Sequence, residues 1–290
     1  RPGPSQTTER RMMSKRPNVL FIISDQHNAK VLGHKGHPNV KTPNLDSLAS
    51  QGVRFRNAFV TTSLCSPSRA TILTGTYAHK HGVLNNRVRL DPRFPTFPQE
   101  LRRAGYKTAF VGKWHMGHET DEPQPGFDHW ASFVGQGNYH KNNFNINGQK
   151  RLVEGYVTDV ITDMSLEWLK QNAAGPFMLY MSHKAVHAMF YPPPRHQKLY
   201  ADAQITMPAS SLDTSENYYR RPRWVREQRD SWHGINDMYF KELDLVTFIR
   251  SYWRTVQGVD DSIGRLLATL EELRILDSTL IVFTSDNGFL

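Results

Sequence analysis

The stretch N-V-L-F-I-I-S, residues 18–24, is a continuous apolar run that ends at Asp25-Gln26-His27. A run of this length without polar alternation is typical of a strand buried on both faces of a parallel sheet. Three later runs have the same form and also end in ionisable or metal-binding side chains: residues 107–111 before Gly112-Lys113-Trp114-His115, residues 177–182 before His183-Lys184-Ala185-Val186-His187, and residues 279–285 before Asp286-Asn287-Gly288.

Segments with helical periodicity lie between these runs, at residues 44–51, 68–77, 97–104, 156–171 and about 245–273. Strands that alternate with helices predict an α/β fold with a mostly parallel sheet. Ligands bind such sheets outside the carboxyl ends of the strands. The polar residues that follow the four runs are therefore expected to form one site, although each alone would be an ordinary cap or turn residue.

Length and composition are those of a globular chain. The 290 residues, 38% of them hydrophobic, allow one large domain or two small ones. No run approaches the length of a membrane helix, and residues 1–16 contain no apolar signal core. This segment is expected to be disordered or added by cloning. Because the chain has a single cysteine, it forms no intramolecular disulfide, and the redox compartment stays open.

The formal net charge of +9 favours anionic partners. Lysine and arginine are spread along the chain, however, and their densest cluster, residues 220–229, surrounds Trp224. This cluster is expected to be a solvated basic loop. Without a recognised basic and aromatic motif, nucleic-acid binding is the weakest of the functional hypotheses.

Oxygen donors dominate the predicted site. Asp25, Asp286 and Asn287 offer hard oxygen ligands, and Gln26 adds a carbonyl oxygen. Such a set suits Ca²⁺ or Mg²⁺ better than zinc, and calcium is the expected ion. Asp286-Asn287-Gly288 also has the composition of a turn, and the two interpretations are compatible.

The only cysteine lies in C-S-P-S-R, residues 65–69, followed by an apolar run that ends at Thr74-Gly75. A lone cysteine is usually a small buried hydrophobic residue. This segment, however, resembles the signature of the type I sulfatases, in which the cysteine is oxidised to formylglycine. The resemblance extends from Pro17 onward and implies an alkaline-phosphatase-like fold, with residues 17–290 forming the catalytic α/β domain.

The resemblance also implies roles for individual residues. Cys65 would become the formylglycine nucleophile and a metal ligand, and Arg69 would hold it beside the metal, at the N-terminus of a helix that starts near Ser68. Lys113 would contact the sulfate oxygens. His115 would help to activate the nucleophile, and His187 would protonate the leaving alkoxide. The metal ligands would be Asp25, Gln26, Cys65, Asp286 and Asn287, with His183 in a supporting position and Lys184 within reach of the site.

Two positions depart from the family pattern. Gln26 replaces a second metal-binding acid, and Val186 replaces a proline before the histidine. A comparable Asp-Gln pair occurs in relatives that hydrolyse phosphonate or choline esters, so a phosphonate or phosphate monoester hydrolase is the first alternative. Asn287 favours the sulfatase hypothesis, because those relatives tend to have histidine there.

The substrate branch is indicated by looser motifs. Residues 135–139 (GQGNY), Asn147-Gly148 and residues 155–159 (GYVTD) resemble sulfatases that remove 6-sulfate from N-acetylglucosamine. Residues 226–234 are similar to a segment of mucin- and glycosaminoglycan-desulfating members. Trp130, Tyr139 and Trp232 are candidates for stacking on a sugar ring.

Several expectations follow from the resemblance. The partners would be a sulfated carbohydrate and a maturation enzyme that converts Cys65, in a secreted, periplasmic or lysosomal setting. The chain stops three residues after Asn287, so a missing C-terminal segment or a second chain is expected to complete the site. A second alternative is an inactive glycan-binding protein with unmodified Cys65. The acid–base groups Lys113, His115 and His187 argue against it, because binding alone does not need them.

Overall fold

The computed structural model describes residues 16–207, 214–228, 230–231 and 244–289. Within them, seven strands form one sheet in the order β5-β4-β3-β2-β6-β1-β7. The strands are β1 (Asn18–Ser24), β2 (Lys107–Lys113), β3 (His129–Phe133), β4 (His140–Ile146), β5 (Gln149–Tyr156), β6 (Phe177–Ser182) and β7 (Thr279–Ser285). Disorder is expected for residues 1–16. Of these, only Arg16 belongs to the described part of the chain.

The pairs β2–β3, β2–β6, β1–β6 and β1–β7 are parallel, which confirms the predicted mostly parallel sheet. The pairs β3–β4 and β4–β5 are antiparallel and were not predicted. The hairpin turn between β4 and β5 consists of Asn147 and Gly148, which both have positive φ, 50° and 91°. Asn-Gly is the preferred two-residue turn for this geometry, so the pair read as a branch motif has a structural role.

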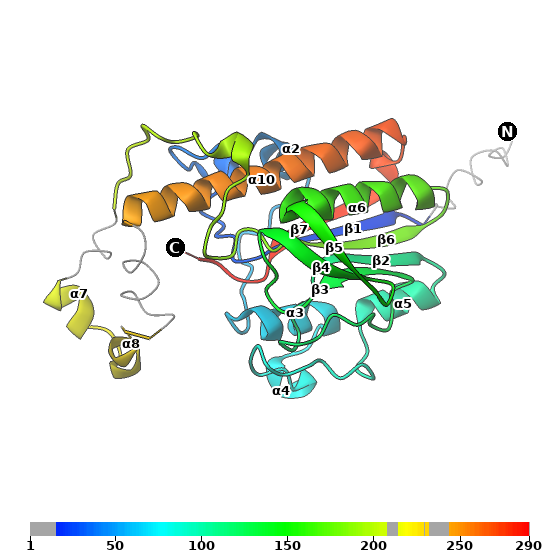
Figure 1. Cartoon of the computed structure of the whole chain (residues 1–290), viewed down its shortest axis with the longest axis horizontal. Helices are drawn as coiled ribbons and strands as arrows, with labels where there is room; N and C mark the ends of the chain where they lie inside the picture. The colour runs from blue at the N-terminus through cyan, green and yellow to red at the C-terminus, as the bar shows by residue number, and fades with distance from the viewer. Residues whose placement is uncertain (1–15, 208–213, 229, 232–243, 290) are drawn as a thin grey trace, which may run out of the picture.

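The strands β1, β2 and β6 are largely apolar because both faces of the sheet are covered there. Leu20 and Ile22 face a core formed with α6 and α10, whereas Ile23 faces a second core with Ala70 and Leu73 of α3. Figure 1 shows α2, α6 and α10 on one side of the sheet and α3, α4 and α5 on the other. The α-helices are α2 (Pro43–Gln51), α3 (Cys65–Thr74), α4 (Ala78–His81), α5 (Phe97–Arg103), α6 (Val157–Asn172), α7 (Ser215–Tyr219), α8 (Arg223–Glu227) and α10 (Leu245–Glu272).

The helix expected to start near Ser68 begins three residues earlier, at Cys65. Pro67 therefore lies inside the first turn, where its missing N–H breaks no intrahelical hydrogen bond. The helix ends at Thr74, and Gly75 takes the left-handed conformation with φ 65°. The first turn thus places Cys65 itself at the positive end of the helix dipole.

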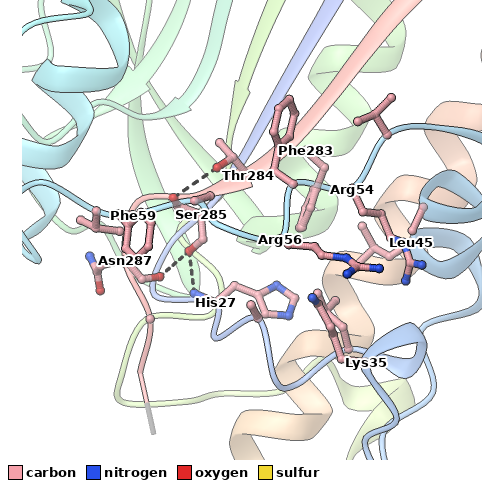
Figure 2. Close-up of a pocket in the computed structure, with 18 of the residues that line it drawn as sticks. His27, Lys35, Leu45, Arg54, Arg56, Phe59, Phe283, Thr284, Ser285 and Asn287 are labelled. Carbon is pink, nitrogen blue, oxygen red and sulfur yellow. Dashed lines mark hydrogen bonds between the residues drawn. The ribbon is translucent and has the colours of Figure 1, made fainter.

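Within the described residues, β7 is an edge strand, and Leu280 is 55% exposed. A groove of about 600 Å³ lies beside it, lined by residues of β7, α2 and the segment 52–61. Figure 2 shows Phe283 and Phe59 in this groove, with Arg56 and Lys35 on one side and Asn287 on the other. In the described ranges, no helix has the length and apolar character that a membrane crossing requires.

Candidate active site and metal centre

The candidate site lies at the carboxyl ends of β1, β2, β6 and β7. Ser24 of β1 is paired with Ser285 of β7, so the residues that follow, Asp25 and Asp286, lie side by side. All the candidate residues except the partly exposed Gln26 are buried in this structure: Asp25, Cys65, Arg69, Lys113, His115, His187, Asp286 and Asn287. Parallel register therefore brings together side chains that are far apart in the sequence.

Hydrogen bonds from Gln26 and Asn287 fix the Asp286 carboxylate. Gln26 has a positive φ of 59°, which is uncommon for a residue with a side chain, and its backbone N–H donates to Asp286 Oδ1 at 2.9 Å. The side-chain amide of Asn287 donates to the same oxygen at 3.1 Å. The Gln26 side-chain oxygen accepts from the Ala188 N–H at 3.4 Å.

Arg69 joins α3 to three strand ends. Its Nε donates to Asp286 Oδ2 at 3.0 Å, and its Nη1 donates to the Lys113 carbonyl at 2.8 Å and to Ser182 Oγ at 2.7 Å. Only 2% of the side chain is exposed. Burial alone would lower the pKa of Arg69, but the charges of Asp286 and Asp25 raise it, so the guanidinium stays charged.

Lys113 ends β2 with its ammonium in contact with Asp25 Oδ2 and Gln136 Oε1, and 3.8 Å from Cys65 Sγ. The preceding residue, Gly112, has φ 119°, and a Cβ there would lie 1.9 Å from the Ser182 carbonyl oxygen. Glycine is thus required where β2 and β6 approach each other. The close approach brings Lys113 next to Ser182.

The two buried carboxylates differ in their protonation equilibria. Burial alone would raise the pKa of Asp25, but the charges of Lys113 and Arg69 hold it below its usual value. Burial, followed by the negative charge of Asp25, raises the pKa of Asp286. Two adjacent buried acids of this kind favour additional positive charge between them.

The Cys65 thiol is 2% exposed, and its Sγ lies 3.5 Å from Asp25 Oδ1. Burial and the nearby charge of Asp25 raise the pKa of the thiol to about 12. Because the thiolate is the reactive form of cysteine, an unmodified Cys65 is a poor nucleophile at neutral pH.

Two histidines flank the cysteine. Asp25, Cys65 and His187 each offer one atom that could bind a metal, and these three atoms lie within 4.8 Å of one another. His115 is fully buried, and neither of its ring nitrogens has a hydrogen-bond partner among the described residues. Burial, followed by the charge of Lys113, lowers the pKa of His187 to about 3 and that of His115 to about 2. Both imidazoles are therefore neutral in the free site.

Other predicted residues lie elsewhere. The His183 ring contacts Ser262 of α10 at 3.2 Å and does not join the cluster. Trp130 is not available to stack on a sugar, because it is 1% exposed and packs on Phe110 at 4.6 Å between ring centroids. Tyr139 is not available either: it is 5% exposed. Trp232 lies outside the described residues, as do His233 and Gly234 of the loosely matched segment.

Sequence reasoning missed several residues that hold the site together. Gln136 contacts Lys113, Ser182 donates to the Lys113 carbonyl at 2.6 Å, and Ser68 donates to the Asp286 carbonyl at 2.5 Å. Gln136 lies in the GQGNY segment, whose resemblance to a substrate branch does not indicate a contact with Lys113. The serines gave no separate signal, because serine is common at strand ends and helix starts.

The donor set fits a divalent cation that prefers oxygen. Asp25, Asp286 and Asn287 converge with carboxylate and amide groups at one end of the sheet, and the acids are buried and adjacent. Such hard donors suit Ca²⁺ or Mg²⁺. Gln26 is placed at the same corner by its backbone hydrogen bond to Asp286.

Comparisons with known proteins agree with this geometry. A family model described as Sulfatase matches residues 17–290. The chain is 33% identical to N-acetylglucosamine-6-O-sulfatase of Bacteroides thetaiotaomicron, an alignment that covers 95% of this chain and 59% of that protein. It thus spans less than two thirds of that relative's length.

Two solved structures show the same fold. One, a protein in complex with its substrate D-glucosamine-2-N,6-O-disulfate, has a TM-score of 0.79 at 33% identity, covering 95% of this chain and 66% of the other. The other, the phosphonate monoester hydrolase of Agrobacterium radiobacter, has a TM-score of 0.70 at 23% identity, covering 95% and 64%. The expected alkaline-phosphatase-like fold, a mixed sheet flanked by helices, is confirmed.

Proposed function

Because the chain belongs to the sulfatase family, we propose that it hydrolyses sulfate monoesters, namely those of a sulfated amino sugar of the N-acetylglucosamine-6-sulfate type in glycosaminoglycan or mucin glycans. The observation that carries the proposal is the position of Cys65, buried at the start of α3 among Asp25, Arg69 and Lys113. Its environment suppresses thiol reactivity and surrounds it with cations that suit an anionic ester. Residues 17–290 form the catalytic domain in this proposal.

Formylglycine at position 65 would supply a hydrated aldehyde. One hydroxyl would bond to sulfur as the bond from sulfur to the ester oxygen breaks, and the other would lose its proton as sulfate leaves and the aldehyde re-forms. Lys113 holds the sulfate oxygens, and Arg69 fixes position 65 relative to Asp286. His115, whose ring nitrogens have no partner among the described residues, receives the proton from the second hydroxyl. His187 would pass the proton that the attacking hydroxyl loses to the leaving alkoxide.

The proposed metal is calcium, with magnesium as the other ion that fits. When bound, the ion would supply Lewis-acid polarisation of a sulfate oxygen and would offset the repulsion between Asp25 and Asp286. Asp25, Gln26, Asp286, Asn287 and the modified residue 65 are its proposed ligands. A maturation enzyme that oxidises Cys65 and a secreted, periplasmic or lysosomal location belong to the same proposal.

We expect calcium to stabilise the chain. At about 100 times its dissociation constant, the ion raises the free energy of unfolding by about 2.7 kcal/mol, because it binds only the folded site. Urea unfolding with calcium and with a chelator measures this difference. Asp286→Ala removes it, whereas Asp277→Ala, at an exposed position, leaves it unchanged. Equal calcium stabilisation of the Asp286→Ala variant would place the ion elsewhere.

A substrate comparison separates the proposal from its main alternative, a phosphonate or phosphate monoester hydrolase. The enzyme is assayed with N-acetylglucosamine-6-sulfate and with the matching 6-phosphate, and the release of sulfate and of phosphate is quantified. The proposal predicts a higher kcat/KM for the sulfate ester. Faster release of phosphate would favour the alternative, and release of neither product would favour a glycan-binding protein.

A further inference from the structure

Lys184 is a buried cation beside the candidate site that the proposed reaction does not use. Lys113 and Lys184 are the buried lysines of the described residues, 0% and 5% exposed. Lys113 is in contact with the Asp25 carboxylate. Lys184, by contrast, has no carboxylate in ion-pair contact among the described residues, and its ammonium lies 4.9 Å from the centroid of the Tyr139 ring.

The loop after β6 holds Lys184 next to the catalytic candidates. The Lys184 carbonyl accepts from the His187 N–H at 3.0 Å, and the Tyr139 hydroxyl donates to the His187 carbonyl at 2.7 Å. Lys184 and His187 therefore belong to one turn, and Tyr139 contacts both. The ammonium also interacts electrostatically with Lys113, Asp25 and Cys65, so its charge acts on the site.

Lys184 takes no part in the ion pairs around the cysteine. Arg69 and Lys113 face Asp25 and Asp286, two cations against two anions. A buried ammonium without an anion is unfavourable, because contact with an aromatic ring compensates only part of the lost hydration. A ligand that brings an anion to Lys184 would supply the missing partner.

The position of Lys184 favours an anion other than the ester that is cleaved. Lys113 and Arg69 contact Asp25 and Asp286, next to Cys65. The aromatic partner of Lys184, Tyr139, contacts Tyr191 at 5.8 Å between centroids, and Tyr191 is 57% exposed. The Lys184 ammonium thus lies against Tyr139 and outside the ion pairs that Lys113 and Arg69 make, so an anion that reaches it lies beside the ester that is cleaved.

We propose that Lys184 binds a second anionic group of the sulfated sugar, beside the ester that is cleaved. The inference rests on the proposed function and makes its substrate class more specific: an amino sugar with two anionic substituents, for example one sulfated on nitrogen as well as on O6. Tyr139 holds the ammonium in place and does not stack on the sugar.

Calorimetric titration tests the inference with two ligands that differ only at the nitrogen, N-acetylglucosamine-6-sulfate and glucosamine-2-N,6-O-disulfate. The protein carries Cys65→Ala to prevent turnover. We expect the disulfate to bind about 10 to 100 times more tightly, as for a hydrogen bond between charged groups. Lys184→Met removes this preference and leaves binding of the monosulfate nearly unchanged. Lys184→Arg keeps most of the preference, and the exposed-site control Lys80→Met keeps all of it.

Three outcomes would overturn the inference: equal affinity of the Cys65→Ala protein for both ligands, no binding of either, or an equal loss for both ligands in Lys184→Met. The last would assign Lys184 to the ester that is cleaved. Retention of the preference by Lys184→Arg guards against misfolding as the cause. Sulfate release from the monosulfate by the protein with intact Cys65 tests the proposed function separately, so the two can fail independently.

Discussion

Replacement of Cys65 by alanine is expected to lower kcat/KM for a sulfated sugar by at least about 10⁴-fold, because the variant has no nucleophile at position 65. Alanine fits the buried position without a new polar group, and Cys65 is 2% exposed. The measurement is sulfate release from N-acetylglucosamine-6-sulfate by the variant and the parent protein. If kcat/KM falls while the urea midpoint of unfolding is unchanged, the loss of activity is due to the missing nucleophile and not to unfolding.

The matched control is Ser63→Ala, two residues away and exposed. It should have parental activity, since Ser63 lies outside the cluster. If Cys65→Ala retained activity within tenfold of the parent, the nucleophile would have to be another group, and the role of α3 in the proposal would be wrong.

Replacement of Arg69 by methionine is expected to lower the free energy of unfolding by about 3 to 5 kcal/mol, because removal of one partner leaves buried charges uncompensated. Arg69 contacts Asp286 at 3.0 Å and also binds the Lys113 carbonyl and Ser182. Urea unfolding in chelator measures the effect without help from a bound cation. Activity should fall as well, because Arg69 fixes position 65 relative to the strand ends.

The control for this prediction is Arg102→Met. Arg102 forms an ion pair with Asp128 at 2.6 Å, but it is 56% exposed, so its loss should change stability by less than about 1 kcal/mol. The double variant Arg69→Met with Asp286→Asn should recover part of the loss, since the uncompensated charge is removed. If Arg69→Met and Arg102→Met lowered the free energy of unfolding equally, burial of the Arg69 ion pairs would not be the cause of the loss.

The parallel half of the sheet was predictable, and the antiparallel half was not. A continuous apolar run marks each of the strands β1, β2, β6 and β7. Strands β2 and β6 are buried almost throughout and β1 is mostly buried, whereas β7 is a partly exposed edge strand among the described residues. The hairpin β4–β5 lacks that mark: β4 contains K-N-N-F-N, and most residues of β5 are exposed. Its clearest local signal, Asn147-Gly148, is compatible with both a turn and a branch motif, and the structure shows the turn.

The site residues that directly follow a strand were predictable from the sequence. Asp25, Lys113, His187 and Asp286 all occur within a few residues of a strand, so parallel pairing alone brings them together. Gln136 and Ser182 act through contacts with Lys113 that depend on the tertiary fold. The aromatic candidates were misjudged because sequence does not distinguish an exposed ring from one in the core, as Trp130 illustrates.

The most direct test of the central claim is the mass of the tryptic peptide of residues 57–69 in a preparation that releases sulfate. Conversion of Cys65 to formylglycine predicts a mass about 18 Da below that of the cysteine form, since CH₂–SH is replaced by CHO. The account predicts this loss in every active preparation. Sulfate release by a preparation in which this peptide carries only an intact thiol would contradict it.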